Sequence, residues 1–283
     1  MPQPRPLSIA IVSPGGTGCP IAEDLASGLA QRGHRIRIYR GEPGFVRTFR
    51  RLRADAPDVV SQHAGDCEAF ALADHLPVLH TLHVAPSRAL IEACLRSQAW
   101  FAAPSAFSAR QWQAAGLERV RIIPGGVPAL PLPPAVVRPV ALVADRVGAM
   151  AALRAGLGIA MLGAIERTRG ALWRKLAHCA VVVASGSASS FDSLAAQAQL
   201  AGCPVVGYAN GALAEIVEDG RSGFLVANGD ESALSSAARR ARLLDRHLVR
   251  ASARARLLLE PMLDRYETEL RAIARRSAVR LVA

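Results

Sequence analysis

The residue pattern that most directly suggests chemistry is a glycine turn followed by a short helical stretch. Gly211 stands in that turn, directly before a predicted helix over 212–218. Because glycine has no Cβ, the backbone at such a turn can approach another group closely. The free N–H groups at the start of a helix, aided by the helix dipole, bind anions. The sequence therefore predicts an anion site at Gly211 and the first residues of this helix.

Three histidines lie at or near the ends of predicted strands, namely His63, His80 and His83. Imidazole is a common metal ligand, but these histidines come without the carboxylate pattern that would complete a metal site. A histidine in an apolar segment also packs commonly as a structural residue. We therefore expect no metal, and we assign the histidines to packing or to contact with an acceptor substrate.

Several well-known nucleotide-binding and catalytic motifs are absent. A dinucleotide fingerprint needs a third glycine, whereas Gly16-Thr17-Gly18 is followed by Cys19-Pro20-Ile21. A P-loop needs a lysine after its glycines, and the single lysine, Lys175, stands in no such motif. No G-x-S-x-G hydrolase turn occurs. These absences exclude three large enzyme classes.

The composition describes a folded and strongly basic chain. Of its 283 residues 51% are hydrophobic, yet no apolar run approaches the roughly 18–20 residues of a membrane-spanning helix. The net charge is +11, and all but one of the 34 cationic residues are arginines. Since the arginines are dispersed and aromatic residues make up only 5%, we expect solvated helix faces and no nucleic-acid partner. The basic surface also fits an anionic membrane or a phosphorylated substrate.

The cysteines and the N-terminus bear on the compartment. The five cysteines form no C-x-x-C pair and are odd in number, which is typical of a reduced protein. The N-terminus lacks a signal-peptide pattern, because Arg5 precedes a short strand-like run that ends in a turn. We expect a cytoplasmic protein, with the inner face of the membrane as the alternative location.

Strand-sized apolar runs alternate with longer amphipathic stretches, which is the pattern of a doubly wound parallel α/β sheet. In the first half we predict strands at 8–13, 35–39, 57–60, 77–80, 100–103 and 119–123. In the second half we predict strands at 140–144, 158–162, 179–184, 204–208 and 223–226. The main predicted helices are 20–32, 47–53, 148–155, 168–177, 191–201, 212–218 and nearly all of 231–279.

A proline-rich stretch divides the two halves. Residues 128–139 contain five prolines in twelve positions, too many for a helix or a central strand, so we predict a linker. On either side we expect Rossmann-like α/β domains, at 1–127 and 140–260, followed by a terminal helix at 261–283. Two such domains form a cleft, in which a ligand is expected to bind.

The most specific motif covers 26 residues, from Ala201 to Val226. It reads G-x-P-V-V, then a glycine turn, E-I-V, D-G and G-x-L-V. This order resembles the donor domain of GT-B glycosyltransferases, specifically of the retaining group called family 4. The turn Pro14-Gly15-Gly16, the segment that ends at His83 and the terminal Tyr266 follow the order of the same family.

The resemblance implies a nucleoside-diphosphate sugar as donor, retained anomeric configuration, no metal and no other cofactor. Catalytic roles fall to His83, near the reacting sugar, and to Arg146, which would neutralise charge on the leaving diphosphate. Donor contacts fall to Gly15, Gly16, Ser189, Phe191, Gln197, Asn210, Gly211, Ala212, Leu213 and Glu215. Among these, Gln197 would contact the ribose. The acceptor would be a glycan or a lipid-linked molecule, within carbohydrate biosynthesis.

The chain departs from the family pattern at two glutamates that normally stand eight residues apart. Ser189 and Gln197 occupy these positions, although Phe191 of the motif is retained. A lysine expected shortly after Arg146 is missing, and residues 140–165 lack about one strand–helix unit, so we expect a shortened donor domain. Two alternatives therefore stand beside hexosyl transfer. One is a catalytically silent module that binds nucleotide or a partner protein, and the other is a nucleotide-sugar epimerase.

Overall fold

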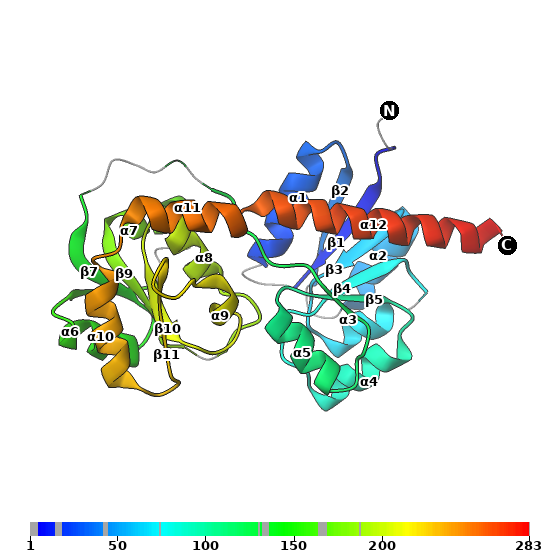
Figure 1. Cartoon of the computed structure of the whole chain (residues 1–283). Helices are drawn as coiled ribbons and strands as arrows, with labels where there is room; N and C mark the ends of the chain where they lie inside the picture. Colours follow the sequence, from blue (N-terminus) through cyan, green and yellow to red (C-terminus); the bar gives the residue numbers. More distant parts are fainter. Residues whose placement is uncertain are drawn as a thin grey trace. The chain divides into compact units, whose positions relative to one another are not determined.

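The computed structural model describes residues 5–14, 19–41, 45–73, 75–129, 131, 136–163, 169–186 and 188–282. The chain forms two compact α/β units (Figure 1). The first unit consists of Met1–Gly125 together with Leu259–Ala283, and the second of Gly126–Leu258. The chain thus leaves the first unit once and returns to it with its last helix.

The sheet of the first unit has six parallel strands in the order β2-β1-β3-β4-β5-β6. The strands are β1 (Ser8–Ser13), β2 (Arg35–Arg40), β3 (Val59–Gln62), β4 (Val78–Thr81), β5 (Trp100–Ala103) and β6 (Val120–Ile122). The helices between them are α1 (Pro20–Gln31), α2 (Phe45–Asp55), α3 (Cys67–Leu72), α4 (Arg88–Arg96) and α5 (Ala106–Ala114). All six strands predicted for this half are confirmed.

The sheet of the second unit has five parallel strands within the described residues, in the order β11-β10-β9-β7-β8. They are β7 (Arg138–Val143), β8 (Gly158–Met161), β9 (Cys179–Ala184), β10 (Val205–Tyr208) and β11 (Gly223–Val226). The helices are α6 (Arg146–Arg154), α7 (Arg169–His178), α8 (Ser193–Leu200), α9 (Leu213–Ile216), α10 (Glu231–Ala241) and α11 (Arg246–Arg256). In both units the first strand lies between the second and the third, so both follow the same doubly wound plan.

The central strands of each sheet are buried on both faces, and β9 shows how the sequence causes this. Val181 and Val183 pack with Ala151 of α6 on one face, whereas Val182 packs with Trp173 of α7 on the other. Successive side chains of a strand point to opposite faces, so a strand covered on both sides must be apolar throughout. The uninterrupted apolar run at β9 therefore predicted its place inside a parallel sheet.

The predicted linker at 128–139 extends two residues too far. Arg138 and Pro139 belong to β7, whose register against β9 shifts just after Arg138. Proline has no N–H to donate to a neighbouring strand, and an irregularity of this kind lets it stand inside a sheet. Five linker residues, 130 and 132–135, lie outside the described part of the chain.

The region 231–279, predicted to be helical almost throughout, forms three helices that end with α12 (Leu259–Val282). Asp245 separates the first two, because its carboxylate accepts the backbone N–H of His247 (2.7 Å) and so starts α11. Pro261 stands in the first turn of α12, where its missing N–H costs nothing, whereas in a continuous helix it would break the hydrogen-bond pattern.

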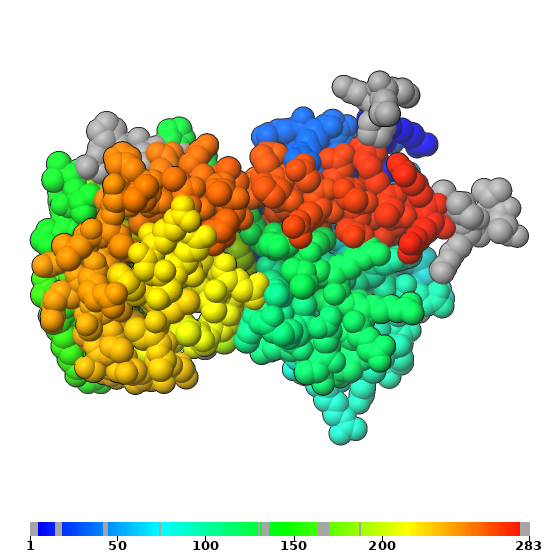
Figure 2. Space-filling model, viewed as in Figure 1, coloured from blue at the N-terminus to red at the C-terminus, as the bar shows by residue number. Residues whose placement is uncertain are grey.

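Helix α12 packs on the first unit, and Figure 2 shows it, in orange to red, across the surface of that unit. Arg32 at the end of α1 forms ion pairs with Glu260 (2.7 Å), Asp264 (2.8 Å) and Glu267 (3.1 Å) of this helix. Three carboxylates on one half-buried guanidinium hold the helix more firmly than an isolated surface pair would. Glu260, which we had expected at the end of the second domain, therefore lies in the first unit.

Candidate functional site

The winding of the second sheet reverses between β7 and β9, and ligands of parallel sheets bind at the carboxyl ends of the strands at such points. Asp145 follows β7 and Ser185 follows β9. The Ser185 hydroxyl donates to Asp145 Oδ1 (2.6 Å), which also accepts the N–H of Gly148 (2.8 Å). A Cβ on Gly148 would lie only 2.8 Å from the Ser185 hydroxyl. The Asp145 carboxylate therefore fixes the start of α6 against the loop after β9.

Arg146, predicted to be catalytic, is the first residue of α6 and is exposed. Within the described residues its guanidinium forms no ion pair or hydrogen bond. It stands beside the N-terminal N–H groups of α6, where the helix dipole is positive. A guanidinium and a helix start, held together by Asp145, form an arrangement that favours a phosphate group.

Gly211, predicted to bind the donor, packs closely against another part of the chain. Its φ of +59° is one that glycine adopts readily, and an added Cβ would lie 2.7 Å from the Ser189 nitrogen and 2.9 Å from the Ala188 Cα. The N–H of Ala212 donates to the Ser189 carbonyl (2.9 Å). The space that a Cβ of this residue would occupy is thus filled by the backbone of Ala188 and Ser189.

The predicted helix over 212–218 is a single turn, α9, of four residues. It ends because Val217 is extended (φ −93°, ψ 123°) and the N–H of Glu218 donates to the Ser222 hydroxyl (2.9 Å) instead of continuing the helix. One turn has little dipole, since the dipole grows with the number of aligned peptide units. The predicted helix bounds are therefore wrong, the anion site at this helix start stays a prediction, and the longer helix α6 offers the better candidate.

The other predicted donor residues of this loop differ in accessibility. Ala212 and Leu213 are buried at 0% and 4% exposure and belong to the core. Asn210 is half-buried, and its amide donates to the side chain of Asn228 (3.1 Å), which follows β11. Glu215 is exposed. Polar side chains that could meet a ligand are thus Asn210 and Glu215.

The loop after β9 and the helix α8 contain the other donor residues predicted in the second unit. Ser189 is half-buried, and Phe191 packs against the core. The Gln197 amide donates to the Ser193 carbonyl of its own helix (3.1 Å). Asp192, which the sequence did not single out, begins α8 by accepting a backbone N–H of the first turn (2.9 Å), and burial raises its pKa. The signal that could have identified Asp192 and Asp145 is an aspartate directly before a helix.

In the first unit, His83 and His63 meet at the carboxyl edge of the sheet, after β4 and β3. His63 Nδ1 and His83 Nε2 share a hydrogen bond of 2.9 Å, and the rings stack with centroids 5.2 Å apart. Burial lowers the pKa of His83 to about 4, and burial together with the neighbouring His83 and His80 lowers that of His63. Both rings are therefore neutral near pH 7, and His83 can position a hydroxyl group but carries no charge there.

Tyr266 of α12 reaches the same edge. It is fully buried, its hydroxyl shares a hydrogen bond of 2.9 Å with the Thr81 hydroxyl, and its ring centroid lies 6.0 Å from that of His63. The terminal helix thus supports the strand that ends at the histidines. Gly15 and Gly16, which we also predicted to bind donor, lie outside the described residues.

His80 is separate from this pair and serves in packing. It is fully buried, with its ring between Phe70 (4.2 Å between centroids) and Phe101 (5.6 Å). Neither ring nitrogen has a hydrogen-bond partner in the described part of the chain. Burial without a partner disfavours the imidazolium and lowers the pKa of His80 to about 3.

Because His80 is buried as a neutral imidazole, we expect the free energy of unfolding to fall in acid. The unfolded chain binds a proton at His80 near its ordinary pKa of 6.5, whereas the folded chain does so only near 3. Its contribution to stability is thus intact above 6.5, and below that it falls by about 1.4 kcal/mol per pH unit. His80→Leu should flatten this dependence. At pH 7 it should raise the free energy of unfolding by about 1–3 kcal/mol, since two unpaired nitrogens are removed.

Urea unfolding at neutral and acid pH measures both effects. His247→Gln, at an exposed position, is the matched control and should alter neither. A His80→Leu protein whose stability falls with pH as steeply as that of the parent would contradict the assignment.

A comparison with known protein families finds a match for part of the chain. Residues 140–243, from β7 to just beyond α10, match the model of the family described as glycosyl transferases group 1. This stretch contains Asp145, Arg146 and Gly211. A sequence search of the curated proteins found no match.

Solved structures resemble the whole chain. HepE from Anabaena, solved with UDP and glucose, has 15% identity and a TM-score of 0.71, over 94% of this chain and 100% of its own. AviGT4, a glycosyltransferase of avilamycin A biosynthesis, has 19% identity and a TM-score of 0.71, over 95% and 98%. Sucrose-phosphate synthase from Thermosynechococcus elongatus has 15% identity and a TM-score of 0.75, over 94% and 98%. The two units thus have the fold of GT-B glycosyltransferases, as the sequence predicted.

Proposed function

We propose that this protein transfers a hexose from a nucleoside-diphosphate sugar to an acceptor, with retained configuration and without a metal in the transfer step. The observation that carries this proposal is Arg146, exposed at a fixed helix start within the stretch that matches group 1 glycosyl transferases. Arg146 would hold the diphosphate and stabilise the charge that develops on it as the sugar leaves. Preorganised positive charge can supply this stabilisation in place of a metal ion.

The remaining roles follow from what each side chain can offer. Gln197 would turn its amide from its own helix to the ribose, and Asn210 and Glu215 would contact the donor. In the first unit, His83 would position the acceptor hydroxyl as a neutral hydrogen-bonding group. We propose a glycan or a lipid-linked molecule as the acceptor.

The arginines of α2 indicate the surface at which the protein would meet its acceptor. Arg47, Arg50 and Arg51 are exposed on this helix, whereas Phe45, Phe49 and Leu52 are buried. No helix in the described ranges is both long and apolar enough to cross a bilayer. A basic helix face of this kind is attracted by anionic lipid, about 1 kcal/mol per arginine near the surface. We propose a cytoplasmic protein that contacts the membrane from its inner face.

Calorimetric titration of the purified chain with UDP, GDP and ADP, beside a donor-hydrolysis assay, tests the proposal. The complexes of HepE with UDP make UDP the first ligand to use. We expect one of the three nucleotides to bind with a Kd below about 1 mM, and the matching sugar donor to be hydrolysed slowly. A protein that binds none of the three would contradict a donor site in the second unit.

A catalytically silent nucleotide-binding module is the second candidate, and Ser189 favours it. The family glutamate that Ser189 replaces would supply a carboxylate, and the Gln197 amide is engaged in its own helix. We expect Ser189→Glu combined with Gln197→Glu to raise donor turnover by about tenfold, since general acid–base and charge effects of single groups reach 10²–10⁴-fold in intact sites. Ser236→Glu on the exposed face of α10 is the control. Unchanged turnover in both proteins, with nucleotide still bound, would support the silent module.

A further inference from the structure

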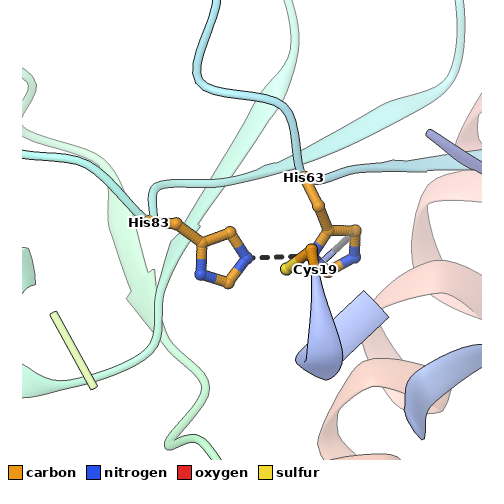
Figure 3. A group of neighbouring side chains, drawn as sticks. All are labelled: Cys19, His63 and His83. Atoms are coloured by element: carbon orange, nitrogen blue, oxygen red, sulfur yellow. Dashed lines mark hydrogen bonds between the residues drawn. The ribbon is translucent and has the colours of Figure 1, made fainter. Parts of the chain in front are cut away.

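Three side chains with the chemistry of metal ligands meet at the carboxyl edge of the first sheet (Figure 3). Cys19 directly precedes α1, His63 follows β3 and His83 follows β4. The Cys19 sulfur and one ring nitrogen of each histidine all lie within 4.8 Å of one another. Figure 3 shows the thiol and both imidazoles directed toward a common point. Both histidines were predicted near strand ends, but Cys19 could not be connected with them from the sequence, because 44 residues or more separate the cysteine from either histidine.

We propose that Cys19, His63 and His83 form a binding site for a zinc-type divalent cation, with a fourth position open to water. Thiolate and imidazole are the ligands that Zn²⁺ prefers, and three protein ligands plus one open position is a common zinc arrangement. Magnesium and calcium are poor candidates, because both require oxygen ligands and this group of three has none. The site was not expected, since we had predicted that the histidines bind no metal.

The distances need only small adjustments. A tetrahedral zinc ion with bonds of about 2.0–2.3 Å holds its ligand atoms about 3.3–3.6 Å apart. The two ring nitrogens are 2.9 Å apart, joined by a hydrogen bond that the metal would replace. No separation in the group exceeds 4.8 Å, so the ligand atoms must approach by at most about 1.5 Å, which a side-chain rotation of the half-buried Cys19 can provide.

The hydrogen bond on the far side of the His63 ring also favours metal binding. His63 Nε2 lies 2.9 Å from the Ser61 hydroxyl, so an N–H there can donate to Ser61 while Nδ1 keeps its lone pair for a metal. Burial raises the pKa of the Cys19 thiol, so binding of a metal has to release its proton. Ser61 is fully buried, so the orientation of His63 is fixed before any ion arrives.

This site is independent of the sugar-transfer proposal, because it would exist in a silent module as well. It has one consequence for an active enzyme. A bound ion would occupy the nitrogen of His83 that faces the group, so zinc would lower the rate of transfer to an acceptor that His83 positions.

Titration of the full chain, reduced and freed of metal by a chelator, with Zn²⁺ against a chromogenic chelator tests the site. We expect one equivalent to bind with a Kd of about 1 µM or tighter. Co²⁺, used as a spectroscopic probe, should give the charge-transfer absorption of a cobalt–thiolate bond. Cys19→Ser and His83→Gln should each weaken zinc binding at least about 100-fold, and Ser61→Ala about tenfold, because ligand and supporting contacts contribute at these levels.

Cys67→Ser and His247→Gln, a cysteine and a histidine at exposed positions, are the matched controls and should bind zinc as the parent does. Cys19 and His83 are only partly buried, so their variants should fold, and circular dichroism checks this. Zinc binding weaker than about 1 µM, or binding that Cys19→Ser and His83→Gln leave unchanged, would overturn the proposal.

Discussion

Replacing Gly223 with alanine is expected to destabilise the second unit severely. Gly223 begins β11 and is paired with Val205 of β10. A Cβ at this position would overlap the carbonyl oxygen of Val205, so the two strands would have to separate. The position of the Cβ is set by the backbone of residue 223, and its neighbour is a backbone carbonyl. Neither atom can move away by a side-chain rotation. We expect a loss of about 4 kcal/mol or more, at the upper end of the range for single substitutions.

Urea or thermal unfolding of the purified proteins measures this loss. Gly186→Ala is a matched control in the same unit, because an added Cβ there would meet nothing within 4 Å and the backbone needs no positive φ. We expect a change of no more than about 0.5 kcal/mol for this control. Equal effects at the two positions would show that the close contact of β11 with β10 does not govern stability.

Gly223 and Gly211 show what a sequence motif can and cannot reveal. Both belong to the motif from Ala201 to Val226, and the motif correctly predicted a GT-B fold. The space beside Gly211 was predicted to face a ligand. In the structure it holds the backbone of Ser189, as the space beside Gly223 holds that of Val205. A glycine reveals that something lies close by, but only tertiary structure reveals whether the neighbour is a ligand or the chain itself.

Helices and strands were predictable from the sequence where the spacing of hydrophobic residues alone determined them. The apolar runs of β1 and β9 predicted buried parallel strands, since both faces of each sheet are covered. The ends of elements were less predictable, because distant side chains set them. Ser222 ends α9 through its hydroxyl, and a register shift admits Pro139 to β7. Neither cause is visible in a local pattern of hydrophobic residues.

In the candidate site, too, local features were predictable and contacts between distant residues were not. The position of Arg146 just after a strand was predictable from the apolar run that precedes it, whereas its role stays a prediction. The contact of Asp145 with Ser185 was not, because 40 residues separate the partners and each alone is an ordinary surface residue type. Parallel sheets bring the ends of successive strands together, so residues far apart in sequence become neighbours there. The order of strands in the sheet, more than any motif, determines which of them meet.

The largest functional effect is expected at Arg146. Arg146→Ala should weaken nucleoside-diphosphate binding by about 10–100-fold, because a charge-assisted hydrogen bond to phosphate contributes about 1.5–3 kcal/mol. Donor turnover should fall further than binding, since negative charge on the leaving diphosphate grows as the bond to the sugar breaks. Calorimetric titration and the donor-hydrolysis assay measure the two effects separately.

Arg154→Ala is the matched control, because Arg154 closes the same helix and forms an exposed ion pair with Glu231 (3.1 Å). We expect it to change binding by less than about twofold, since exposed ion pairs contribute little. Arg146→Lys should fall between the two, because lysine keeps the charge but cannot offer two parallel N–H groups to one phosphate. If Arg146→Ala and Arg154→Ala bind nucleotide equally well, the phosphate does not lie at the start of α6. The donor must then be sought at Asn210 and Glu215, two other accessible polar residues of the second unit.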